Sequence, residues 1–452
     1  MSLFGLTVSN HEASTLVSLQ TPYGGWPLLA DYWEQRVNSL TRKRANLLSM
    51  NRINFDCAST TPLLPEVKTA ISAAFDEVGN ASAVHQAGQR AKEHLTRARR
   101  QVAALIHAKP EEIHFTSCGT ESNNWAVRGL WAGNKRKGNR VLLSAIEHPS
   151  VSLIARRLEL DGLASLTTLP VDREGLVRPA DLKAALTPET VLVSVMLANG
   201  EVGTIEPIRE LAAVAHEHGA LFHTDAIAAV GHLPIDVREL NVDALSLAAN
   251  QFYGPQGAAA LFVRENIRIL PLLEGGGQEQ GARSGTEAVP ALVGMGVAAE
   301  AAQRVLPQRI AHLARLRDRL REGLQQYLTG LRFNGSWTAR LPHNLHVCFE
   351  GVSSESLVLG LDQAGVAVGL GSACNSKAMR PSHVLKAMGL TDEQAHGALV
   401  FSLGAQTTEA DIEAVLERLP PVLEQLRRVT KLTTRAEERK LESGRSEPET
   451  GR

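Results

Sequence analysis

The sequence lacks the features that mark membrane, secreted or nucleic-acid-binding proteins. No apolar run approaches the roughly 18 residues of a membrane helix, and the first residues show no secretory signal pattern. Lysine and arginine number 47 against 48 for aspartate and glutamate, so no strong field attracts nucleic acid or an anionic membrane. The 4 cysteines show no CxxC pairing and no zinc-ligand spacing, which favours a reducing compartment and predicts no metal site. We therefore expect a cytoplasmic protein.

The composition is that of an ordinary globular protein. Of its 452 residues, 44% are hydrophobic and 21% charged, enough to bury two cores. Short β-rich runs alternate with longer helical patterns, which indicates an α/β fold with a mostly parallel sheet covered by helices. The predicted strands include 191–196, 220–223, 244–247 and 258–263, and the predicted helices include 87–106, 205–218, 309–328 and 409–429.

One stretch combines a strand, a turn and a helix start. Residues 112–116 are predicted as a strand and 117–120 as a turn, with a helix from Glu121 onward. A turn that enters a helix presents free N–H groups and a positive dipole end, which suits a phosphate. An ordinary capped helix would look the same. Asp225 follows another apolar strand, at the end where α/β sheets gather their ligands, although a helix cap is the plainer interpretation there.

Eight segments, taken together, resemble the cysteine desulfurases, which are pyridoxal-phosphate enzymes of the class V aminotransferase group. The resemblance runs from about residue 51 to about residue 430, and it rests on the shared order and spacing of the segments because each one alone is weak. They are 56–62, 79–85, 115–124, 147–148, 199–204, 223–226, 283–286 and 371–374.

The resemblance implies a fold type I pyridoxal-phosphate transferase. Residues 64–307 would form the large domain with the mostly parallel sheet, while 50–63 and 308–432 would form a smaller α+β domain. Residues 1–49 would precede the family-like region, either as a docking arm rich in aromatic residues or as a mis-assigned start before Met50. Residues 433–452 are charged and poor in apolar side chains, so we predict a disordered tail.

The resemblance also implies residues that would contact pyridoxal phosphate. Gly119 and Thr120 would hold its phosphate, His148 would stack on its ring, and Asn199 would reach the ring oxygen. Asp225 would pair with the pyridine nitrogen and keep it protonated, so that the ring acts as an electron sink.

Two further residues concern partners. Thr286 would reach the phosphate from a second subunit, which implies a homodimer. Cys374 stands in the place of the nucleophile that receives sulfur from cysteine and carries it as a persulfide, because a thiolate attacks sulfur readily. Inheritance of Cys374 without use would look the same. The other cysteines, at 57, 118 and 348, are predicted to be inert and buried.

Five positions depart from the family pattern. Gln251 stands where the resemblance predicts the lysine that forms the Schiff base and moves the substrate α-proton, and glutamine can do neither. Any bound pyridoxal phosphate would then not be a lysine aldimine. Val400 stands in the place of the arginine that grips the substrate carboxylate. The other three replace a glutamine, a serine and a histidine; they are Ala228, Ala248 and Asn250.

Each departure could also reflect a shifted alignment, an engineered inactive variant or tolerated drift. Together they favour a desulfurase-like protein that acts in sulfur trafficking through Cys374, with a protein as sulfur donor or acceptor, or as a scaffold. Two alternatives stay open. One is an active cysteine desulfurase or related enzyme with non-covalent cofactor, and the other is a regulatory pseudoenzyme subunit of an active paralogue.

Overall fold

The computed structural model describes residues 52–371 and 381–444, with side chains described up to residue 430. The chain divides after Asn51 into two units, and every statement below concerns the part from Arg52 onward. The predicted extension 1–49 and Cys374 therefore lie outside the described residues.

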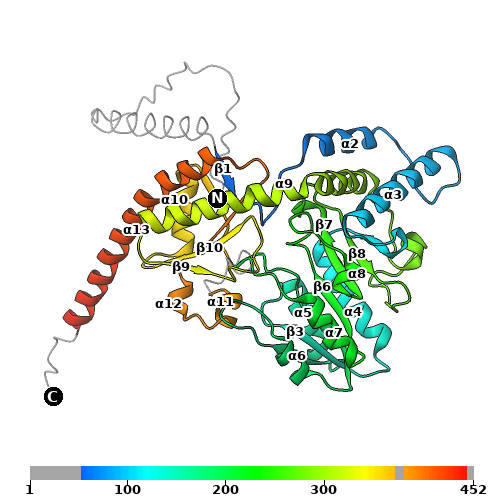
Figure 1. Ribbon diagram of the computed structural model, residues 1–452, viewed down its shortest axis with the longest axis horizontal. Helices are drawn as coiled ribbons and strands as arrows, with labels where there is room; N and C mark the ends of the chain where they lie inside the picture. Colours follow the sequence, from blue (N-terminus) through cyan, green and yellow to red (C-terminus); the bar gives the residue numbers. More distant parts are fainter. Residues whose placement is uncertain (1–51, 372–380, 445–452) are drawn as a thin grey trace, which may run out of the picture. The chain divides into compact units, whose positions relative to one another are not determined.

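A seven-stranded sheet forms the centre of the larger part of the fold (Figure 1). Its strand order is β2-β8-β7-β6-β5-β3-β4, and only β8 runs antiparallel to its two neighbours. The predicted α/β fold with a mostly parallel sheet is confirmed. The strands are β2 Ile113–Thr116, β3 Arg140–Ser144, β4 Ser165–Leu169, β5 Thr190–Ser194, β6 Leu221–Asp225, β7 Ala244–Ala248 and β8 Ala259–Val263.

Helices cover both faces of this sheet. Neighbouring residues of a strand therefore lie in two separate cores, one on each face. Leu142 and Phe222 belong to one core, and Leu143 and Leu221 belong to the other. Strands buried on both faces read as continuous apolar runs, which is why the sequence pattern located them. The helices and short 3-10 turns of this part are α2 Pro65–Phe75, α3 Gln86–Leu105, η1 Pro110–Glu112, α4 Gly119–Asn134, α5 Pro149–Leu160, α6 Pro179–Ala185, α7 Ile208–Glu217, α8 Val237–Leu240, η2 Ala249–Gln251 and η3 Gln278–Gly281.

A smaller core contains two short sheets, one antiparallel with the order β12-β10-β9 and one parallel pair, β1-β11. Leu320, Val347, Leu361 and Phe401 are buried in this core. Its strands are β1 Ile53–Phe55, β9 Leu331–Asn334, β10 Asn344–Phe349, β11 Val366–Val368 and β12 Ala398–Ser402, and its helices are α9 Val289–Tyr327, α10 Ser354–Gln363, α11 His383–Ala387, α12 Asp392–Ala395 and α13 Glu409–Gly444.

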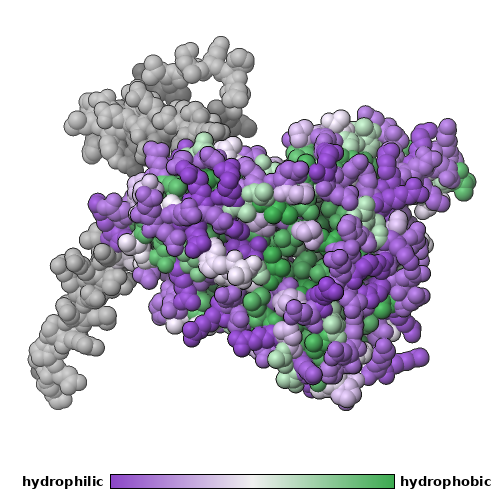
Figure 2. Space-filling model, in the orientation of Figure 1, coloured by the Kyte–Doolittle hydropathy of each residue, from purple (hydrophilic) through white to green (hydrophobic). Residues whose placement is uncertain are grey.

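Helix α9 is longer than the sequence predicts, because it begins at Val289 rather than near residue 309. Pro307 removes one backbone hydrogen bond within it, yet the helix continues because both halves are buried. Met295 lies in a core of the large sheet and Leu320 in the smaller core. Figure 1 shows α9 crossing from one part to the other, and in Figure 2 apolar side chains gather below it on an otherwise hydrophilic face.

Helix α13 also differs from the sequence prediction, because it extends to Gly444 through most of the segment predicted as a disordered tail. Residues 435–442 read Arg-Ala-Glu-Glu-Arg-Lys-Leu-Glu. These residues have high helix propensity, and oppositely charged residues spaced three or four apart support a helix even where little apolar surface is buried. No described helix is long and apolar enough to cross a membrane.

Two loops join the large sheet to the smaller core. The loop between β9 and β10 meets the turn between β5 and α7, where Ile205 N–H donates to Ala339 O at 2.9 Å and Leu341 N–H donates to Gly203 O at 2.8 Å. Arg340 is buried in this joint, and burial lowers its pKa to about 10. Its guanidinium donates to three backbone carbonyls, those of Ser336, Asn334 and Asn344.

We predict that Arg340→Lys destabilises the protein by about 3 kcal/mol, because one ammonium cannot replace a forked donor that serves three buried carbonyls. Urea unfolding measures this loss. Arg304→Ala is the matched control, because that arginine is 60% exposed and pairs with Glu66 at the surface, where such pairs contribute about 0.5 kcal/mol. Equal losses in the two variants would contradict a joint that depends on Arg340.

Candidate functional site

The predicted site residues follow strands that end at one edge of the large sheet. Asp225 is the last residue of β6, and Gln251 follows β7 in η2. Gly119 begins α4, shortly after β2 ends at Thr116. The structure starts this helix two residues earlier than predicted. Because β2, β6 and β7 point the same way, their carboxyl ends meet at the edge where α/β folds place ligands.

Asp225 is buried and sits in a short chain of polar side chains. Its carboxylate accepts the amide of Asn123 at 2.7 Å and the N–H of Ile227 at 2.9 Å. Asn123 also donates to the Ser150 hydroxyl at 2.9 Å, and this hydroxyl lies 2.7 Å from Nδ1 of His148. Burial raises the pKa of Asp225, while these hydrogen bonds and His148 oppose the rise. The structure thus brings the predicted ring contacts Asp225 and His148 into one network.

His148 also has a local structural function. It is the N-cap residue of α5, and its ring nitrogen accepts the N–H of Ser150 at 3.2 Å. The side-chain oxygen of Asn123, which lies between Asp225 and Ser150 in the network, is buried without a partner, and an unmet buried acceptor is costly. The network therefore retains capacity for one more donor beside Asp225.

Apolar atoms meet at the first residue of α4, the predicted phosphate position. A Cβ added to Gly119 would lie 2.3 Å from Cδ1 of Ile227 and 3.6 Å from Cβ of Ala248. Ile227 therefore fills the space that the missing side chain leaves. Thr120, the second predicted phosphate residue, is exposed.

Asn199 is buried, and its side chain serves its own turn. Its side-chain oxygen accepts the N–H groups of Glu201 and Val202, both at 2.9 Å, and its amide donates to Ile146 O at 3.1 Å. Ala228, one of the predicted departures, faces the same turn, since a Cβ on Gly200 would lie 3.5 Å from the Ala228 methyl. Asn199 thus holds the backbone that borders the site.

Gln251 is buried and already hydrogen-bonded. Its side-chain amide donates to Ala58 O at 2.8 Å, and its backbone carbonyl accepts from His232 at 2.9 Å. The neighbouring carbonyl of Asn250 accepts both the N–H and the hydroxyl of Thr61, at 2.8 and 2.9 Å. Residues 250 and 251 therefore tie the end of β7 to the segment after β1.

Val400 lies in the middle of β12 and is buried. It pairs with His346 across the sheet, and its backbone exchanges two 2.9 Å hydrogen bonds with Gly369. Two residues further on, the Ser402 hydroxyl accepts the N–H of Ala58 at 2.8 Å. The carbonyl of Ala58 accepts a hydrogen bond from the Gln251 amide. Ala58 therefore connects Gln251 with the strand that carries Val400.

The loop that carries Thr286 is fixed to the start of α4. Arg283 donates to the Glu121 carboxylate at 2.7 and 3.1 Å, and Glu121 also accepts the N–H of Ser117 at 2.7 Å. These bonds lower the pKa of Glu121 against the opposing effect of burial. Thr286 itself is exposed, and its predicted contact with a second subunit stays a prediction.

The burial of the described cysteines agrees only in part with the prediction. Cys57 and Cys348 are buried as expected, and burial raises the pKa of their thiols to about 12 and about 11. The prediction that Cys118 is buried is wrong, because it is exposed as the N-cap residue of α4, beyond the end of β2. The described residues contain no cluster of three or more potential metal ligands.

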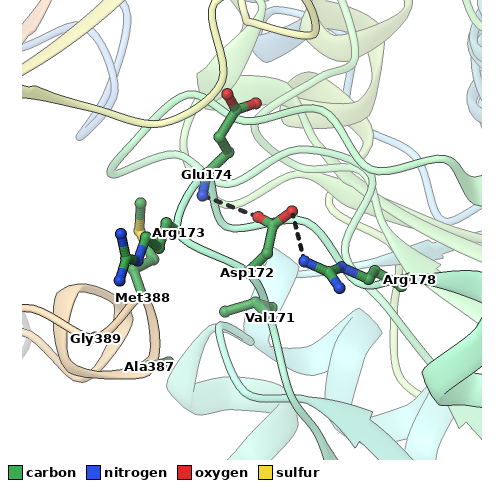
Figure 3. A pocket seen from close by; sticks show the side chains of 8 residues that line it. All are labelled: Val171, Asp172, Arg173, Glu174, Arg178, Ala387, Met388 and Gly389. Atoms are coloured by element: carbon green, nitrogen blue, oxygen red, sulfur yellow. Dashed lines mark hydrogen bonds and ion pairs between the residues drawn. The ribbon is translucent and has the colours of Figure 1, made fainter.

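A separate surface cleft of about 550 Å³ lies between the loop after β4 and the end of α11 (Figure 3). Val171 and Met388 line it, and so does Asp172, which accepts the N–H of Glu174 at 2.9 Å and lies 3.9 Å from Arg178. Of the predicted site residues that the structure describes, none lines this cleft.

The residues at the strand ends fit pyridoxal phosphate only in part. Asp225, His148 and the start of α4 offer the kind of groups that a pyridine ring and a phosphate use. The five predicted departures offer three aliphatic side chains and two amides, with no amine, hydroxyl or guanidinium. They do not fit a cofactor held as a Schiff base, because an amide nitrogen is not a nucleophile.

This fold and site define a class of protein. The family model described as "Aminotransferase class-V" matches residues 53–415, and the chain belongs to that family. Cysteine desulfurase IscS from Clostridium botulinum (strain Hall) is 43% identical over 387 residues, which cover 85% of this chain and 97% of that protein. The Methanosarcina thermophila protein of the same name is 43% identical over 84% of this chain and 94% of its own.

Solved structures agree with these relatives. A NifS-like protein superimposes with a TM-score of 0.78 at 32% identity, over 83% of this chain and 100% of that chain. A structure described as SspA in complex with cysteine gives a TM-score of 0.68 at 33% identity, over 78% and 99%. The chain is thus a cysteine desulfurase homologue. The family predicted from the eight segments is confirmed, while the replacement of the Schiff-base lysine by Gln251 stays a prediction.

We predict that Gly119→Ala destabilises the protein by about 1–3 kcal/mol, because the new methyl would overlap Cδ1 of Ile227. Ile227→Val removes that atom and alone should cost about 1 kcal/mol. The double variant should then be more stable than the sum of the two losses predicts. Urea unfolding of the four proteins measures this coupling, and strictly additive losses would show that Ile227 does not fill the space beside Gly119.

Proposed function

We propose that this cysteine desulfurase homologue transfers sulfur through Cys374 without releasing it from cysteine by a lysine aldimine of its own. The observation that carries the proposal is the environment of Gln251. Its amide donates to Ala58 O in a buried position, and an amide supplies neither the nucleophile nor the base of the desulfurase reaction.

Val400 supports the same proposal from the side of the substrate. A free amino acid brings a carboxylate that needs a charged, preferably forked, partner. The buried valine side chain cannot supply one, and its backbone N–H and C=O are already bonded to Gly369. Cysteine would lack its carboxylate anchor at this position.

The transfer that remains needs only a thiolate. The Cys374 thiolate attacks the outer sulfur of a donor persulfide, the donor's sulfur–sulfur bond breaks, and the donor leaves as a thiolate. The outer sulfur and its proton stay on Cys374, so no external oxidant or reductant is required. The donor or acceptor would be a protein, and the exposed Thr286 loop would contact a second copy in a homodimer.

A second candidate is an active desulfurase with a non-covalent cofactor. The named relatives, 43% identical over most of the chain, favour this candidate, and so does the network that joins Asp225 to His148. The chemistry at Gln251 and Val400 favours the first. A role as regulatory subunit of an active paralogue stays a prediction.

The first proposal predicts that the purified protein releases no sulfide from cysteine in the presence of pyridoxal phosphate, yet accepts sulfur from a small-molecule persulfide. Absorption spectra, sulfide release and mass-spectrometric detection of a sulfur adduct at Cys374 measure the three properties. Cys374→Ser should abolish the adduct, and Cys118→Ser, which removes the one exposed thiol among the described cysteines, is the matched control. Sulfide release with a cysteine-dependent spectral change would establish the second candidate instead.

The effects of Gln251 and Val400 can be separated by restoring the family's residue first at one position and then at both. Gln251→Lys alone should let pyridoxal phosphate form a reducible Schiff base, visible as an absorption band that borohydride removes, but sulfide release should stay low because Val400 cannot hold the substrate carboxylate. Gln251→Lys with Val400→Arg should release sulfide at least about 100-fold faster, as expected for restoring a bidentate ion pair in a site. Equal rates in the two variants would contradict the role given to Val400.

A further inference from the structure

Trp337 is an exposed aromatic residue that lies beside two arginines. It belongs to the loop between β9 and β10, and 38% of its surface is exposed. The guanidinium carbon of Arg321, from α9, lies 4.0 Å from the centre of the indole ring, and that of Arg340 lies 4.5 Å from it. Phe333 packs edge-on against the indole, with 6.1 Å between the ring centres. These contacts fix the orientation of an exposed ring.

The loop is fixed on both sides of Trp337. Before it, the N–H of Ser336 donates to the Thr204 hydroxyl at 3.0 Å. After it, the Arg317 guanidinium donates to Leu341 O at 3.1 Å. A side chain on a fixed backbone loses little conformational freedom when it binds a partner, and this favours affinity.

The arginines around this indole carry more positive charge than their ion pairs neutralise. Arg317 pairs with the neighbouring Asp318 at 2.8 Å. In the part of the chain that the structure describes, neither Arg321 nor Arg340 forms an ion pair, and Glu174 is a second carboxylate that acts on Arg340 from a distance. Burial lowers the pKa of Arg340, and the charges of Arg317 and Arg321 lower it further. An anion beside these groups would be stabilised by their charge.

Arg321 also has hydrogen-bond donors without acceptors. Its Nε–H is buried and has no partner, and its other two nitrogens donate to none of the described residues. The indole N–H of Trp337 likewise donates to no described residue. Because guanidinium and indole groups only donate, two neighbouring side chains offer donors and positive charge to an acceptor that the described chain does not supply.

We infer that Trp337 and Arg321 form a docking site for an acidic segment of a partner protein, because the exposed indole and the unpaired guanidinium lie together on a fixed loop and helix. Charge complementarity selects carboxylates, which a guanidinium binds through two parallel hydrogen bonds. Tryptophan and arginine are enriched among the residues that carry the affinity of protein interfaces. Small ligands prefer concave sites, and neither residue lines the cleft of about 550 Å³. The site includes neither Cys374 nor Gln251, so it stands apart from the proposed function.

The test titrates the full chain into a fluorescently labelled hexaglutamate peptide and follows the fluorescence anisotropy. We expect binding that weakens as salt concentration rises, and Arg321→Ala should weaken it at least about fivefold. Arg321→Gln keeps most of the side-chain length without the charge, and it should show the same loss if Arg321→Ala does not fold. Trp337→Ala should also weaken binding, whereas Trp337→Phe keeps an aromatic face for the guanidinium and should lose less.

Arg100→Ala is the matched control, because it removes the same charge from an exposed position in α3 and should leave binding close to the wild type. Equal losses in the Arg321 and Arg100 variants would show only general electrostatic attraction and would overturn the inference, and so would a wild type that binds no peptide. Inorganic phosphate that displaces the peptide at equal concentration would assign the site to small anions instead. Self-association that Arg321→Ala removes, measured by analytical ultracentrifugation, would make a second copy of this chain the occupant. Each of these two results would also contradict an acidic partner protein.

Discussion

The joint around Arg340 is the interaction on which the rest of the structure depends. A guanidinium buried between two loops would be costly if its donors were unmet, and here three backbone carbonyls meet them. The turn 199–204 is held in place by this joint and by the hydrogen bonds of the Asn199 side chain within the turn. That turn in turn presents Gly200 to Ala228 and Glu201 to Gly371. The position of the site thus follows from how two loops satisfy their backbone groups.

Under the function proposed here, the site keeps its framework while its reactive chemistry has changed. Positions that hold backbone or cap helices, such as Asn199, Glu121 and His148, retain polar side chains with partners in the structure. At Gln251 and Val400 the side chains are instead satisfied by burial and local hydrogen bonds. If the proposed function holds, the fold persists with a different chemistry, because stability depends on the first group of residues and the family's chemistry on the second.

The sequence predicted the central sheet well because strands buried on both faces are continuous apolar runs. Motif order also placed Asp225 and Gly119 at one sheet edge. Other features depend on contacts that no local pattern contains. The contact of Ile227 with Gly119 and that of Glu201 with Gly371 each join residues far apart in the chain. The full length of α9 was missed because burial in two cores outweighs the local effect of Pro307.

The pairing of β1 with β11 has a consequence for the order of folding. Ile53 lies beside Val366, so the smaller core cannot close until nearly the whole chain has left the ribosome. The large sheet is complete once β8 has been made, and we expect it to form first during synthesis. Until β11 has been made, β1 lacks the strand with which it pairs, and an unpaired strand can pair with another chain. Premature termination beyond β8 would therefore leave a folded sheet with one exposed strand.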